Sequence, residues 1–223
     1  MTHTRSEIAA MIDHTLLKAD ATRQGFEKLC SEAKEYGFAM VAINPAPVAL
    51  CKELLAGSKV HVGAAIAFPL GQTTIEDKVR ETEVAIGNGA DEIDYVVNIT
   101  QLKEGNTKYI EDEMRRIVDV CRAHDVLIKV IFENCYLTDD EKRTLAKIAK
   151  EVGPDFIKTS TGFGTGGATF ADVELMREVV GDAVQIKAAG GIRSAEDAMK
   201  FVDLGVTRLG TSAGVAIVNA LED

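Results

Sequence analysis

The sequence alternates short β-rich runs with longer stretches of helical spacing, and this alternation limits the possible fold more than any other feature. The runs are four to nine residues long and rich in Val and Ile, so they are predicted as strands at 11–15, 40–44, 60–68, 92–97, 126–132, 155–159, 184–189 and 208–211. Nearly continuous apolar runs are typical of parallel strands that are covered on both faces. Eight such units in 223 residues predict an α/β chain that forms a (β/α)8 TIM barrel as a single domain over residues 1–223, with a short helix before the first strand. A doubly wound open sheet is the competing architecture.

The stretches between the strands carry the signals of helix ends. Four pairs have capping-box spacing: Thr73 with Glu76, Thr138 with Glu141, Thr169 with Asp172, and Ser194 with Asp197. Asn44-Pro45 is a candidate N-cap followed by Pro at the first helical position. Gly153 and Gly205 follow helical stretches, as expected of C-terminal stops.

Composition and motifs exclude several classes of function. A formal charge of -10 offers no basic excess for nucleic acid. We expect neither a signal peptide nor a membrane span, because no apolar run is long enough. The four cysteines lack CxxC spacing and are predicted to be reduced thiols in the cytoplasm. The four histidines form no ligand-spaced cluster, and no GxSxG is present, so we predict neither a metal site nor a serine hydrolase.

Three ionisable residues interrupt the apolar runs. Asp94, Lys158 and Lys187 lie near the C-terminal ends of their strands, where active sites of barrels are found. Each alone has a simpler explanation, since a lysine at a strand end can reach water and an aspartate there can cap a turn. Together they suggest one interior cluster. Lys129 and Glu133 could extend it, but a structural ion pair or polar layer is the preferred interpretation for these two.

Two lysines and an aspartate fit the chemistry of a Schiff base. A free lysine has a pKa of about 10.4 and is almost wholly protonated at pH 7. Burial and a second cation would lower the pKa of Lys158, and Lys187 could be that cation. The iminium formed with a carbonyl substrate would then accept electrons from a breaking C–C bond, while Asp94 transfers protons.

Glycine-rich loops follow the last three predicted strands, at 160–167, 189–194 and 210–214. Ordinary turns could have this composition, but backbone N–H groups in such loops bind phosphate, and barrels use the loops after strands 7 and 8 for that purpose. A literal GxGxxG at Gly162, Gly164 and Gly167 is rejected as a dinucleotide site, because the next strand carries Lys187 where an acidic residue is needed.

The chain resembles the deoxyribose-phosphate aldolase family. The resemblance rests on "IDHTLL", "FPLG", "GADEIDYVVNI", "KVIFE", "DFIKTSTGF", "KAAGGIR" and "LGTSAG", which occur in the family's order from Asp13 to Gly214. It implies a cofactor-independent class I aldolase that reversibly cleaves 2-deoxy-D-ribose 5-phosphate to D-glyceraldehyde 3-phosphate and acetaldehyde, in deoxyribonucleotide catabolism. The expected partners are therefore the small sugar phosphate and acetaldehyde, whereas the charge and the apolar run lengths predict no nucleic-acid or membrane partner. A homo-oligomer, either a dimer or a tetramer, is also expected.

The resemblance also assigns roles to residues of this sequence. Lys158 matches the Schiff-base lysine, Asp94 the proton-relay aspartate and Lys187 the second lysine. The substrate- and phosphate-binding positions fall on Asp13, Thr15, Thr161, Gly162, Gly190, Gly191, Gly210 and Ser212.

The sequence departs from the family pattern at two positions. Ala42 stands where many members have Cys, which the Schiff-base chemistry does not need, and Asn134 stands where Thr is common. Two other functions stay open at this point. One is a Schiff-base aldolase or transaldolase for another sugar phosphate, and the other is a non-catalytic sensor of phosphosugars.

Overall fold

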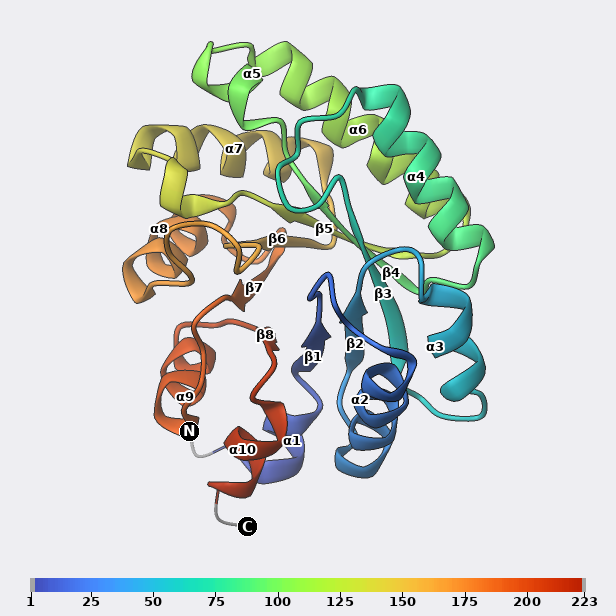
Figure 1. Ribbon diagram of the computed structural model, residues 1–223. Helices are drawn as coiled ribbons and strands as arrows, with labels where there is room; N and C mark the ends of the chain where they lie inside the picture. Colours follow the sequence, from blue (N-terminus) through green and yellow to red (C-terminus); the bar gives the residue numbers. More distant parts are fainter. Residues whose placement is uncertain (1–2, 222–223) are drawn as a thin grey trace.

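The computed structural model describes residues 3–221, and its strands close into one barrel in chain order (Figure 1). Every neighbouring pair is parallel, including the pair that closes the barrel between the first and last strands. The strands are β1 (Ile12–Leu16), β2 (Met40–Ile43), β3 (His61–Ile66), β4 (Glu92–Val96), β5 (Leu127–Ile131), β6 (Phe156–Lys158), β7 (Gln185–Ala189) and β8 (Arg208–Thr211). The predicted barrel is therefore confirmed, and the open sheet is excluded.

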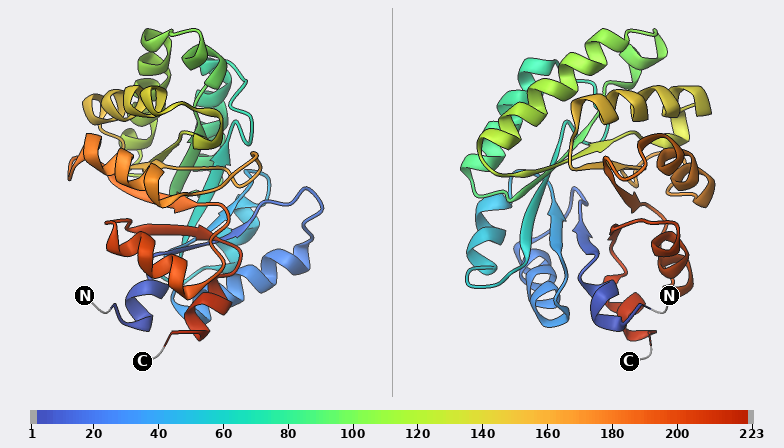
Figure 2. Two further views of the ribbon diagram at one scale, coloured as in Figure 1. Left: turned by 90° about the vertical axis from the view of Figure 1, so that its left-hand side faces the viewer. Right: turned by 180° about the vertical axis from the view of Figure 1, so that it is seen from behind.

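The helices surround the barrel, as the two further views in Figure 2 show. The short helix expected before the first strand is present and packs against the last helix. The helical elements are α1 (Arg5–Ala9), α2 (Arg23–Tyr36), α3 (Val48–Leu54), α4 (Ile75–Gly87), α5 (Ile99–Lys103), α6 (Thr107–Ala123), η1 (Asn134–Tyr136), α7 (Asp139–Val152), α8 (Phe170–Val180), α9 (Ala195–Asp203) and α10 (Gly214–Asn219). No helix within residues 3–221 is long and apolar enough to cross a membrane.

Side-chain hydrogen bonds explain where several helices begin. Thr138 forms the full capping box before α7, and Thr169 and Ser194 cap α8 and α9 as predicted. The prediction for α4 was one residue early, because Thr74 rather than Thr73 accepts the backbone N–H of the first turn. Asn44 is not a cap: its amide donates to the carbonyl of Leu17, and α3 begins only at Val48.

Alternation along the strands separates the apolar residues from the charged ones. On β4, Ile93 and Tyr95 are fully buried, and the ammonium of Lys78 on α4 lies over the Tyr95 ring, so this face packs under the helices. Glu92 and Asp94 point the other way, into the barrel. The strands thus place their charged residues in a closed interior, where the cost of desolvation requires that each charge be paired.

Candidate active site

Asp94 joins the predicted lysines at the centre of the barrel. Its Oδ2 lies 2.8 Å from Nζ of Lys158 and 2.7 Å from Nζ of Lys187. The parallel register of β6 and β7 pairs Lys158 directly with Lys187, so their side chains enter the interior at the same level. The structure therefore brings together the three residues that the sequence singled out.

The Lys158 amine is strongly perturbed. Its pKa is lowered from 10.5 to about 8; burial is the largest cause, the charges of Lys187 and Lys129 also lower the pKa, and Asp94 raises it. At pH 7 a pKa of about 8 leaves about one amine in ten neutral, against about three in ten thousand for an unperturbed lysine. Lys158 can therefore act as a nucleophile near neutral pH.

Asp94 stays ionised despite its burial. Desolvation alone would raise its pKa, but the charges of Lys129, Lys158 and Lys187 outweigh that effect and hold the pKa well below the usual value. The second oxygen, Oδ1, accepts a hydrogen bond of 2.8 Å from Lys129. Asp94 is thus a fixed anion held on both oxygens by lysines.

Lys129 differs from the sequence-based interpretation. The sequence predicts an ion pair or polar layer for Lys129 and Glu133, but Lys129 bonds to Asp94 and Glu92 instead. Glu133 adopts a left-handed backbone with φ of 58°, which ends the strand alternation and directs its carboxylate to the loop after β6. An ion pair between the two residues is therefore wrong, although Lys129 does belong to a polar layer.

Asp13 lies below the lysines rather than on the wall of a cavity. Its Oδ2 is 2.5 Å from Nζ of Lys187, and its Oδ1 accepts a hydrogen bond of 2.6 Å from Arg208. The side chain is fully buried. Asp13 is placed to orient Lys187, and Arg208 is a member of the cluster that the sequence did not single out.

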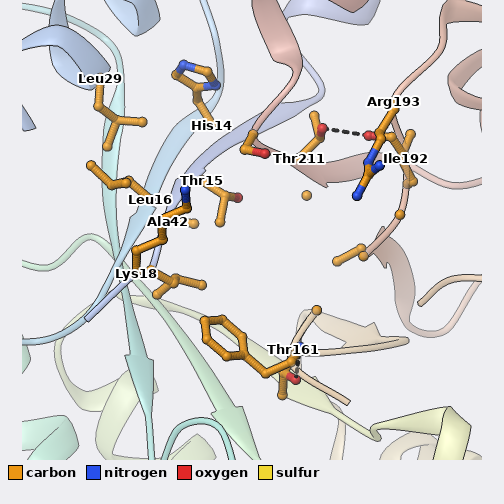
Figure 3. Close-up of a pocket in the computed structure, with 18 of the residues that line it drawn as sticks. His14, Thr15, Leu16, Lys18, Leu29, Ala42, Thr161, Ile192, Arg193 and Thr211 are labelled. Atoms are coloured by element: carbon orange, nitrogen blue, oxygen red, sulfur yellow. Dashed lines mark hydrogen bonds between the residues drawn. The ribbon is translucent and has the colours of Figure 1, made fainter. Parts of the chain in front are cut away.

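A cavity of about 520 Å³ opens above this cluster at the C-terminal ends of the strands. Lys158 lines it, while Asp94 and Lys187 lie beneath the lining. Figure 3 shows Thr15, Lys18 and Ala42 on one side of the cavity, with Arg193 and Thr211 across from them. The other predicted positions that line it are Thr161, Gly162, Gly190, Gly191, Gly210 and Ser212.

The rim of the cavity is built from the predicted glycine-rich loops. Gly190 and Gly191 have φ of 86° and 81°, a backbone that side-chain-bearing residues rarely adopt. The exposed Arg193 guanidinium follows them and lines the same cavity. Backbone N–H groups beside a guanidinium suit an anionic group such as phosphate. Arg193 belongs to the "KAAGGIR" motif, but the sequence alone did not predict it as a ligand.

Thr161 has a different set of partners from those expected of a phosphate ligand. Its backbone N–H donates to Glu133 at 3.1 Å, and its hydroxyl also donates to that carboxylate. The same hydroxyl accepts the N–H of Phe163 at 3.0 Å. Thr161 thus lines the cavity while its donors hold the loop onto Glu133, a function that its sequence position did not reveal.

The two departures from the family pattern lie near the site. Ala42 lines the cavity beside β1, so its small side chain leaves room there. Asn134 begins η1, and its amide lies 3.4 Å from Sδ of Met176. Within residues 3–221, no group of three or more His, Cys, Asp or Glu side chains is arranged to hold a metal ion.

A buried amine of lowered pKa beneath a glycine-rich rim that suits an anion is the arrangement expected of a Schiff-base aldolase. The sequence profile of the DeoC/LacD family aldolases matches residues 8–220. The chain therefore belongs to the DeoC/LacD aldolase family, and the family relationship predicted from the sequence is confirmed.

Individual relatives agree with this assignment over almost the whole chain. A deoxyribose-phosphate aldolase from Lactobacillus acidophilus is 57% identical to this chain. The match covers 100% of this chain and 94% of that relative. A deoxyribose-phosphate aldolase from Bacteroides thetaiotaomicron is 54% identical, and the match covers 97% of this chain and 91% of that relative. The solved tetrameric deoxyribose phosphate aldolase of Aeropyrum pernix superposes with a TM-score of 0.91 at 30% identity, over 97% of this chain and 92% of its own.

Proposed function

We propose that this protein is a class I aldolase that reversibly cleaves 2-deoxy-D-ribose 5-phosphate to D-glyceraldehyde 3-phosphate and acetaldehyde. The observation that carries the proposal is the Lys158 amine, which lines the cavity, has a pKa of about 8 and is bonded to Asp94. Relatives named for this reaction are more than 50% identical over nearly the full chain. The implied place of the reaction is deoxyribonucleotide catabolism.

The reaction begins with attack of neutral Lys158 on C1 of the open-chain sugar phosphate. The new N–C bond displaces the carbonyl π electrons onto oxygen, and proton transfers convert the carbinolamine oxygen to water, which leaves an iminium. Asp94 and Lys187 are the groups placed to exchange these protons, because Asp94 is within hydrogen-bond distance of both the Lys158 amine and Lys187. No cofactor is needed, since the iminium itself accepts electrons.

Cleavage follows from the iminium. Loss of the proton from the C3 hydroxyl forms a carbonyl at C3, the C2–C3 bond breaks, and its electrons move into the enamine on Lys158. Glyceraldehyde 3-phosphate leaves, C2 of the enamine takes up a proton, and water hydrolyses the acetaldehyde iminium. The loops at Gly162, Gly190 and Gly191, together with Gly210, Ser212 and Thr15, would hold the phosphate and sugar.

Reductive trapping tests the nucleophile directly. Borohydride with acetaldehyde should leave a two-carbon adduct on Lys158, located by peptide mass spectrometry. A coupled assay should detect glyceraldehyde 3-phosphate release by wild type and none by Lys158→Leu. An adduct on another lysine would overturn the assignment, and cleavage of fructose phosphates in preference to deoxyribose 5-phosphate would identify a different Schiff-base aldolase.

We also propose that the chain forms a homo-oligomer, a dimer or tetramer, in the cytoplasm. The tetrameric relative from Aeropyrum pernix supports self-association. Four free cysteines, three of them buried, suit a reducing compartment. Light scattering coupled to size exclusion would measure the mass, and a monomer at micromolar concentration would contradict the oligomer.

A further inference from the structure

The barrel interior holds a second charged layer below the reactive amine. Arg208, at the start of β8, donates to Oδ1 of Asp13 at 2.6 Å and to Oε1 of Glu92 at 2.8 Å. Lys129 bonds to the other oxygen of Glu92. Glu92 and Lys129 are fully buried, and only 13% of the Arg208 side chain is exposed. This layer lies at the N-terminal ends of the strands, away from the cavity.

Ion pairs connect this lower layer to the reactive amine. Lys187 contacts Asp13 at 2.5 Å and Asp94 at 2.7 Å, and Asp94 contacts Lys158 at 2.8 Å. The contacts therefore continue without interruption from Arg208 to Lys158. Because water is largely excluded from this path, charges along it are screened less than charges at the surface.

The charges of this network are unequal in number. It contains three carboxylates and four cations, so its formal charge is +1 when all are ionised and zero when one cation has lost a proton. The carboxylates are Asp13, Glu92 and Asp94, and the cations are Lys129, Lys158, Lys187 and Arg208. Lys158 is the member of the four that lines the cavity.

The other charged groups nearby do not remove this imbalance. Glu133 is buried above the cluster, where the loop after β6 donates to it, and no ion pair joins it to the four cations in the described residues 3–221. His61 bonds to Glu92 at 2.8 Å, but 45% of its side chain is exposed. Lys18, Lys28 and Arg193 are exposed to water at the mouth, and Glu32 there is paired with His14 at 2.9 Å.

Resting on the proposed Schiff-base function, we propose that Glu92 and Arg208 are positioning residues that fix the charge of the barrel interior so that Lys158 is the lysine that reacts as a neutral amine. Neither residue lines the cavity, so neither would touch the substrate. The contacts connect Arg208 to Lys158 through Asp13, Lys187 and Asp94. They connect Glu92 to Lys158 through Lys129 and Asp94.

The pKa shifts agree with this arrangement. Burial opposes the charge of Lys129 and Arg208, but the surrounding carboxylates outweigh it and raise both pKa values. For Lys158 the balance is reversed, because burial and the neighbouring cations outweigh the single carboxylate. Removal of the Arg208 charge should therefore favour protonated Lys158, and removal of the Glu92 charge should favour the neutral amine.

Two neutralising variants test these opposite signs. The titration of Lys158 would be followed by NMR of isotope-labelled lysine Nζ on the full chain without substrate, and the acid limb of kcat/KM would be measured with deoxyribose 5-phosphate. Arg208→Met should raise both midpoints and Glu92→Gln should lower both, each by roughly one pH unit, the size expected for one unit charge in a protein interior. Arg208→Lys, which keeps the charge, should move them much less.

Several outcomes would overturn the proposal. Circular dichroism would first show that Arg208→Met and Glu92→Gln are folded. The proposal is wrong if the two folded variants leave the titration midpoint of Lys158 at its wild-type value, or if both shift this midpoint in the same direction. If only one variant folds, the direction in which it shifts the Lys158 midpoint decides whether the proposal holds. In wild type, a lysine other than Lys158 losing its proton first would also overturn it. Shifted titrations in a protein that cleaves no deoxyribose 5-phosphate would uphold the charge relationship and reject the proposed function instead.

Discussion

The Nζ atom of Lys158 lies 2.8 Å from Oδ2 of Asp94, yet the pKa of this lysine is lowered to about 8. A carboxylate at this distance favours the ammonium form, so burial must outweigh it. The same carboxylate is shared with Lys129 and Lys187, which reduces what it can contribute to Lys158. The amine is therefore close to a proton acceptor without being locked as a cation.

Lys187→Met should reduce activity at neutral pH and move the pH profile. Because the Lys187 charge lowers the pKa of Lys158, its removal should raise that pKa, and the acid limb of kcat/KM should shift to higher pH. We expect kcat/KM at pH 7 to fall by roughly 10²-fold or more, since a proton-transfer group is lost as well. Lys187→Arg keeps the charge and should keep the limb near its original position. If the acid limb of kcat/KM does not move in Lys187→Met, Lys187 acts in proton transfer only and does not set the pKa of Lys158.

Asp94→Asn should have the opposite effect on the profile. Asp94 raises the pKa of Lys158, so its loss should lower that pKa and move the acid limb to lower pH. Turnover should nevertheless fall by roughly 10²- to 10⁴-fold, because the proton acceptor is gone. Borohydride trapping with acetaldehyde would separate iminium formation from turnover. Wild-type turnover in this variant would exclude Asp94 from the proton transfers.

Strand alternation explains why the sequence could predict the barrel and the central cluster. Asp94, Lys158 and Lys187 stand in otherwise apolar runs, and in a closed barrel such residues must face the interior. Arg208 was missed because an arginine at the start of a strand usually reaches water, whereas here Asp13 and Glu92 hold it inside.

The loops were harder to predict than the strands. The glycines marked the rim correctly, but the hydrogen-bond partners of Thr161 depend on Glu133, which lies 28 positions earlier in the chain. Its left-handed backbone, with φ of 58°, breaks the alternation on which strand-based predictions rely. Sequence spacing carries no signal for such a turn, so the contact between the two loops emerged only in three dimensions.

Glu133→Ala should loosen the loop after β6 while leaving the amine in place. The carboxylate accepts both the N–H and the hydroxyl of Thr161, and its loss leaves a buried donor unpaired. We expect KM for deoxyribose 5-phosphate to rise by roughly tenfold, the equivalent of one lost hydrogen bond. Glu133→Gln retains an acceptor and should be affected less. Equal losses with unphosphorylated deoxyribose would show that the loop does not serve the phosphate.

Gly167→Ala and Gly166→Ala form a matched pair that tests the packing of the glycine-rich loops proposed to bind phosphate. A Cβ on Gly167 would collide with the backbone carbonyl of Gly190, whereas one on Gly166 would meet Cβ of Cys135 at an ordinary 3.4 Å. Because backbone cannot yield as a flexible side chain can, the first variant should displace the rim and the second should not. Steady-state kinetics should show KM for deoxyribose 5-phosphate raised by roughly tenfold or more in Gly167→Ala, with Gly166→Ala close to wild type. Comparable kinetics in the two variants would mean that the contact between the loops after β6 and β7 does not position the phosphate.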